Sequence, residues 1–143
     1  MLAFVLFSFE CSSEVDFPLP LSPVEQYAYP QSVLTLDVSP NPTTTGTVSQ
    51  TWILREMNGV GMRVDSITMK IHNSAGVLTE TRKLAEADIK ALWESTYIPK
   101  SFIASGTIQM QISGEAGGRL YIHLFGHDDN RYVVSALDTL QII

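Results

Sequence analysis

Short runs in which apolar and polar residues alternate cover most of the chain after residue 31, and turn residues separate them. Alternation with a period of two places every second side chain on one face of a β-strand. In residues 64–73, for example, Ile67, Met69 and Ile71 share one face and polar residues share the other. The pattern predicts about seven strands, at residues 33–38, 48–55, 64–73, 77–83, 105–113, 119–126 and 132–142.

Residues 85–94 (AEADIKALWE) break this alternation. Their apolar side chains recur at helical spacing, at Ala85, Ile89, Leu92 and Trp93. Glu86 and Lys90 form an i,i+4 pair that would lie on the outer side of such a helix. We therefore expect one short helix here, in the crossover between two sheets, which ends before Pro99.

Short strands with turns about every 8–12 residues are typical of an immunoglobulin-like sandwich. The predicted fold class is all-β: an Ig-like antiparallel β-sandwich with one short crossover helix and an extended N-terminal arm. Residues 1–31 would form an apolar, leader-like segment and a proline-rich arm, and residues 32–143 the sandwich. This fold requires Leu120, Ile122 and Leu124 to point into the core.

The first 31 residues differ in kind from the rest. Residues 1–9 are almost continuously apolar, and residues 14–30 hold four of the seven prolines. Proline fixes φ and removes a backbone donor, which excludes an interior helix or a central strand over the second stretch. Fully extended, that stretch would reach about 50 Å.

Three interpretations of this N-terminal segment stay open. It is an uncleaved docking arm that contacts a protein groove or a membrane surface through Phe4, Phe7 and Phe9, or it is a leader lipidated at Cys11, or it is a cleaved signal. The leader match is imperfect because the segment lacks Lys and Arg, and because Glu10 stands where a small residue is expected before the cysteine.

Composition narrows the function classes. A chain of 143 residues with 45% hydrophobic residues can bury a core without covalent staples. The single cysteine excludes an intrachain disulfide and multi-cysteine metal sites. A net charge of -6 argues against nucleic acid as a partner, and no apolar run reaches the roughly 20 residues of a membrane-spanning helix. We expect no cofactor.

Candidate chemistry is sparse. Asp128, Asp129 and Asn130 offer oxygen ligands for calcium, although Asp and Asn are also common in hairpin turns. His123 and His127 would lie about 13 Å apart along a strand, too far to bind one ion. The chain contains no Gly-x-Ser-x-Gly motif and no phosphate-binding loop. We therefore expect a protein that is not an enzyme.

The strand at residues 119–126 has an unusual outer face. If Leu120 and its inward neighbours face the core, then Tyr121, His123 and Phe125 point outward, where a solvated strand normally carries small polar or charged residues. We expect neighbouring strands to extend this face with Lys70, His72, Val134 and Ala136. The face either binds a partner or is covered by the helix or the N-terminal arm; otherwise the strand is inverted.

Three short motifs resemble those of Ig-like or fibronectin-III-like modules of bacterial secreted proteins and lipoproteins. They are SPNP at residues 39–42, Trp52 on the second strand and GHDDN at residues 126–130. His127 and Arg131 stand where such modules often carry Thr and Gly, and the cysteine pair of antibody domains is absent. The resemblance covers about residues 32–143. It implies an extracytoplasmic adhesion, spacer or accessory domain, and it implies no activity.

Together these observations predict a non-catalytic accessory or structural subunit, located in the periplasm or at the cell surface. It would dock on a larger membrane-associated complex of other protein subunits through its N-terminal arm and its aromatic sheet face. The alternative is a carbohydrate-binding or adhesion module of a secreted or lipid-anchored protein, in which the exposed rings would stack on sugars.

Overall fold

The computed structural model describes residues 29–143. The unit Gln31–Ile143 is a β-sandwich. The predictions for Phe4, Phe7, Phe9 and Cys11 fall outside the described residues. Within residues 29–143, no helix has both the length and the apolar character needed to cross a membrane.

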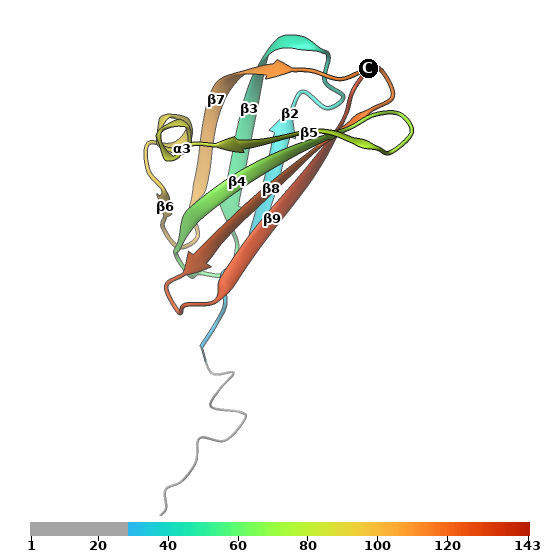
Figure 1. Cartoon of the computed structure of the whole chain (residues 1–143). Coiled ribbons are helices and arrows are strands. Elements are labelled where there is room, and N and C mark those ends of the chain that lie inside the picture. The colour runs from blue at the N-terminus through green and yellow to red at the C-terminus, as the bar shows by residue number, and fades with distance from the viewer. Residues whose placement is uncertain (1–28) are drawn as a thin grey trace, which may run out of the picture. The chain divides into compact units, whose positions relative to one another are not determined.

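Two antiparallel sheets form the sandwich (Figure 1). The three-stranded sheet has the order β2 (Leu34–Ser39), β3 (Gly46–Glu56), β7 (Ile103–Ile112). The other sheet has the order β5 (Leu78–Leu84), β4 (Met62–His72), β8 (Arg119–Asp128), β9 (Val133–Gln141), and the short β6 (Tyr97–Ile98) also pairs with β4. The predicted all-β, Ig-like sandwich is confirmed. The strand β6 raises the number within the described residues to eight, because a two-residue strand leaves no periodic signal.

The helix α3 (Glu86–Trp93) lies in the crossover between β5 and the other sheet, as expected. The predicted ion pair between Glu86 and Lys90 forms at 3.1 Å. Ala85 was expected on the apolar face but is exposed, because it is the residue before the first helical turn and its N–H donates to the carboxylate of Asp88. The helix ends at Trp93, and the next residue, Glu94, has a left-handed φ of 64°.

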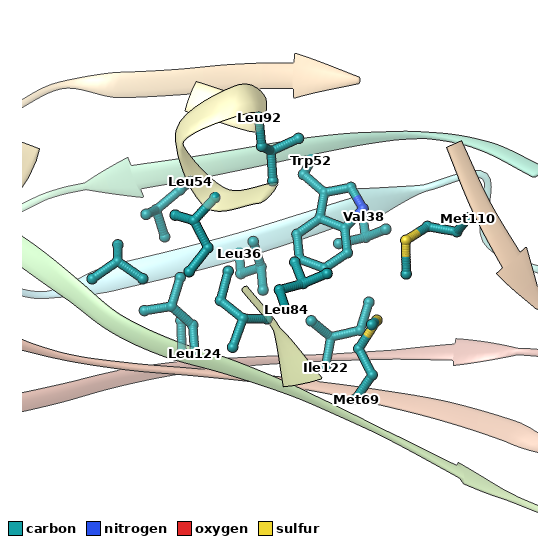
Figure 2. Packing of buried hydrophobic residues seen from close by; sticks show 14 of the residues in the cluster. Leu36, Val38, Trp52, Leu54, Met69, Leu84, Leu92, Met110, Ile122 and Leu124 are labelled. Atoms are coloured by element: carbon teal, nitrogen blue, oxygen red, sulfur yellow. The ribbon is translucent and has the colours of Figure 1, made fainter. Parts of the chain in front are cut away.

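The core lies between the two sheets, and α3 closes one side of it (Figure 2). Leu120, Ile122 and Leu124 are at most 1% exposed, so the orientation predicted for β8 is correct. Trp52 on β3 is wholly buried and packs edge-on against Trp93 of α3, with ring centroids 6.5 Å apart.

One expectation about the outer face was wrong. Val134 and Ala136 on β9 are buried, at 5% and 7% exposure. Directly opposed residues of antiparallel strands share a face, and Ala136 lies opposite the buried Leu124. The outer positions of β9 therefore belong to the alternate set, which includes Val133 and Leu137.

The edge strands β2 and β9 meet along one seam between the sheets. The Asp138 carboxylate of β9 accepts a hydrogen bond from the Val38 N–H of β2 at 2.7 Å. Beyond the strand ends, Thr43 donates to the Gln141 carbonyl at 2.8 Å and accepts from the Ile143 N–H at 2.9 Å. These contacts attach the last residues of the chain beside the start of the first hairpin.

Candidate functional site

The outer surface of the five-stranded sheet contains a hollow of about 400 Å³, here called the aromatic face. Its lining residues come from β4, β8 and β9 and are Thr68, Lys70, Tyr121, His123, Phe125 and Leu137. The strand register explains why they meet: Lys70 lies opposite Tyr121, and His123 lies between Thr68 on one side and Leu137 on the other. Opposed residues share a face, so inward packing of β8 directs these side chains outward together.

The rings on this face pack against one another. The centroids of His123 and Phe125 are 4.1 Å apart with a tilt of 34°, and His72 meets Tyr121 edge-on at 4.9 Å. Phe125 is 38% exposed and Leu137 is 55% exposed. The result is an apolar surface whose rings are already ordered by their neighbours, open to solvent on its outer side.

The opposite outer surface of the sandwich has a very different composition. On β3 and β7, the outward positions are mostly hydroxyl and amide side chains: Thr47, Ser49, Thr51, Ser105, Thr107, Gln109 and Gln111. This is the ordinary composition of a sheet face that meets water. The aromatic face is therefore a property of one sheet and not a general feature of this domain's surface.

The three residues proposed as calcium ligands lie at the turn between β8 and β9. Asp128 is 5% exposed, and its carboxylate accepts N–H bonds from Ser32, Asn130 and Tyr132, each at 2.9 Å. Asp129 accepts the Tyr97 hydroxyl at 2.7 Å, and this hydrogen bond raises the pKa of Tyr97. Within residues 29–143, no three His, Cys, Asp or Glu side chains gather as metal ligands. Asp128 therefore hydrogen-bonds to its own turn and to Ser32, whereas Asp129 hydrogen-bonds to Tyr97. Hydrogen bonds of this kind to nearby backbone groups are common for Asp in turns.

The two histidines of β8 also have separate partners. His127 hydrogen-bonds to Asp65 through Nδ1, whereas His123 packs on Phe125. Asp65 is the extra residue of a bulge in β4, where the pairing with β8 shifts between Val64 and Ser66.

Sequence reasoning missed one buried charge, Glu56 at the end of β3. The side chain is 3% exposed, and its carboxylate accepts six hydrogen bonds. The donors are the N–H groups of Val33, Asn58, Gly59, Val60 and Ser101 and the hydroxyl of Ser32. Burial raises the pKa of Glu56, but the N–H bonds, led by that of Ser101, lower it by more, so the pKa lies below its ordinary value. Glu56 therefore joins three loop segments at one end of the sandwich.

Comparisons with known proteins leave the function to be argued from the site. No protein-family model and no curated protein matches the chain. The ApaA protein from Bordetella pertussis is 10% identical over 78% of this chain and 95% of its own, with a TM-score of 0.46. A CARDB domain from Pyrococcus furiosus is 12% identical over 87% and 100%, with a TM-score of 0.38. The collagen-binding subdomain of the Enterococcus faecalis surface protein ACE is 14% identical over 80% and 97%, with a TM-score of 0.22. Likenesses this distant carry no argument about activity.

Proposed function

We propose that this domain is a non-catalytic binding subunit that attaches to another protein through its aromatic face. The observation that carries the proposal is the contrast between the two outer surfaces: one gathers aromatic rings in a hollow, whereas the outward positions of β3 and β7 are mostly Ser, Thr and Gln, with Ile103 exposed at one end of β7. Aromatic side chains are enriched in protein interfaces and dominate their binding energy. His123, the lining residue best suited to acid–base chemistry, packs on Phe125, and no carboxylate lines the hollow to orient it, which favours binding.

The size of the contact can be bounded from exposure. Complete burial of Phe125 and Leu137, which are now 38% and 55% exposed, would contribute at most about 1.5–3 kcal/mol each. Association itself costs roughly 4–15 kcal/mol. The two side chains can therefore anchor a complex but cannot sustain it alone, and a stable partner must also cover Tyr121 and the surrounding polar rim.

The proposal includes an extracytoplasmic location and a second attachment through the N-terminal segment. Its support is the sequence of residues 1–31, in which Phe4, Phe7 and Phe9 precede Cys11, together with the resemblance to secreted and lipid-anchored modules. Deletion of residues 1–30 is expected to release the protein from the membrane fraction of its source cells. Unchanged co-sedimentation with membranes would contradict this part of the proposal.

Site-specific photo-crosslinking tests the aromatic face directly. A benzophenone amino acid at Phe125 is expected to yield a discrete crosslinked species in the cell envelope, while the same group at Thr107, on the opposite outer surface, is not. The double variant Phe125→Ala/Leu137→Ala should abolish a crosslink formed from Tyr121. Because Phe125 packs on His123 and is only 38% exposed, this variant should lose about 1–2 kcal/mol of stability, and circular dichroism must show that it remains folded under the conditions of the assay. Equal crosslinking from both outer surfaces would refute the proposal.

A carbohydrate-binding or adhesion module is the second candidate. It is favoured by the polar groups of Thr68 and Lys70, which lie beside the ring of Tyr121 in one hollow and could hydrogen-bond sugar hydroxyls. Binding to a neutral glycan on an array, lost in Tyr121→Ala and retained in Thr107→Ala, would establish this function. Such a result would identify a glycan, and not a protein, as the partner of the aromatic face.

A further inference from the structure

The aromatic face carries cations among its rings. Lys83 on β5 lies opposite Thr68, and Arg119 on β8 lies opposite His72. Because opposed residues share a face, Lys83 and Arg119 flank the hollow on the same side of the sheet as Lys70. All three are exposed. The three histidines of the chain, His72, His123 and His127, occupy outer positions of the same two strands.

The carboxylates nearest to this surface are engaged by other groups of the domain, although acidic residues outnumber basic ones by 15 to 9 in the whole chain. Glu80 of β5 lies toward the three-stranded sheet, where Ser113 and Arg82 hydrogen-bond to it. Asp138 of β9 accepts a hydrogen bond from the Val38 N–H at the seam between β2 and β9. Asp65, at the bulge of β4, is engaged by His127. The aromatic face is therefore basic in a protein that is acidic.

We propose that the partner presents an acidic, apolar polypeptide segment to the aromatic face. This inference rests on the proposed function. Carboxylates of the segment would lie over Lys70, Lys83 and Arg119, and its apolar side chains over Phe125 and Leu137. The aliphatic Leu137, which lines the hollow from the edge strand β9 and is 55% exposed, favours a polypeptide over a glycan, because hydroxyl-rich sugars cover aliphatic surface poorly. Exposed ion pairs add little affinity individually but speed encounter and select the sign of the partner's charge.

Fluorescence anisotropy with the full chain and defined peptides tests the charge selection. The probe is a synthetic peptide in which Glu alternates with Leu and Phe; one comparison peptide has Lys for every Glu, and another has Ser for every apolar residue. The first peptide is expected to bind at least about 10-fold more tightly than either comparison peptide. Raising NaCl from about 50 to about 300 mM should weaken its binding several-fold.

Charge reversal locates the contact. Lys70→Glu/Arg119→Glu is expected to weaken binding of the acidic peptide at least about 10-fold. The matched control Lys90→Glu/Lys100→Glu changes the net charge by the same amount at exposed sites elsewhere and should leave the affinity unchanged. Equal weakening by both pairs would overturn the inference, since it would show a response to net charge alone.

Other outcomes name other occupants and also overturn the inference. Tighter binding of the lysine peptide would reverse the sign of the partner. Binding of polygalacturonate in place of the acidic peptide would identify a glycan. Peptide binding that appears only after deletion of residues 1–30 would show that the chain's own N-terminal segment takes this face. A crosslink from Phe125 to a partner without acidic segments would refute the inference and leave the proposed function standing.

Discussion

Replacement of Glu56 by glutamine changes one oxygen of a buried carboxylate into an NH₂ group and keeps its shape. In the native domain the two oxygens accept three hydrogen bonds each, all from groups of the surrounding loops. Whichever way the glutamine amide turns, its NH₂ group faces donors that have lost their acceptor. A buried polar group left unpaired costs about 1–3 kcal/mol, and at least two N–H groups are affected. We therefore expect Glu56→Gln to lower the free energy of unfolding by about 3 kcal/mol.

Urea denaturation followed by the fluorescence of the buried Trp52 and Trp93 measures this loss, with ΔG obtained by linear extrapolation. For a domain of this size, about 3 kcal/mol corresponds to a fall in Tm of roughly 10 °C. The matched control is Glu86→Gln, the same chemical change on the exposed side of α3, where the ion pair with Lys90 is worth no more than about 0.5 kcal/mol. A loss below about 1 kcal/mol at Glu56 would refute the role of its carboxylate in joining the loops.

The pH dependence of the same pair of proteins tests the electrostatic part of the argument. The pKa of Glu56 in the folded protein lies below its ordinary value of 4.5. Its ionised form therefore contributes stability that is fully present above that value and is lost as the pH falls through the lower, folded-state pKa. Glutamine has no such titration, so the stability gap between the parent and Glu56→Gln should narrow as the pH drops below about 4.5. A gap that widens in acid would contradict the direction of the pKa shift.

Three further predictions concern the core and the β8–β9 turn. The Trp52 indole donates to the buried Gln50 amide at 3.0 Å, so Trp52→Phe and Gln50→Leu should each destabilise the domain. A double-mutant cycle measured by urea denaturation should give a coupling energy of about 1 kcal/mol, and additive losses would contradict this hydrogen bond. A Cβ added at Gly106 would meet the Leu92 carbonyl oxygen at 1.7 Å, so Gly106→Ala should displace α3 and lower the free energy of unfolding by more than about 2 kcal/mol. The near-ultraviolet circular dichroism spectrum should change as well, and an unchanged Tm would refute this close contact between β7 and α3. Asp128→Ala should destabilise the domain by about 3 kcal/mol, because three backbone N–H groups lose their acceptor. Calcium should leave the Tm of the parent protein unchanged, and a calcium-dependent rise in Tm would support a metal site at this turn instead.

The strands and the helix were predictable from local patterns because burial imposes its period on the sequence. Ile67, Met69 and Ile71 mark the inner face of β4, and the inward orientation of β8 followed from the same alternation. The pattern also indicated that Tyr121 would point outward, but whether its face binds anything stays a prediction.

Register and loop chemistry escaped prediction for physical reasons. Val134 was placed outward because alternation within a strand does not show how the strand pairs with its neighbour. Glu56 went unnoticed because its partners come from segments distant in the sequence. One signal was available: Trp52, Leu54 and Glu56 share a parity, so a carboxylate stood at an inward position. An acidic residue on the buried face of a strand indicates a structural anion whose donors lie elsewhere in the chain.

The seam between β2 and β9 has a mechanical consequence. The chain enters the sandwich at Gln31, whose side chain donates to the carbonyl of Val133 at the start of β9, and it ends at Ile143, bonded to Thr43 beyond the end of β2. Gln31 thus lies beside the start of β9 and Ile143 follows its end, so the two points lie at opposite ends of the seam. A stretching force between them would act along β2 and β9, and it would load the β2–β3 and β8–β9 ladders in shear instead of breaking their hydrogen bonds one at a time. A domain attached to one body through each end could thereby transmit tension while its sheets stay folded.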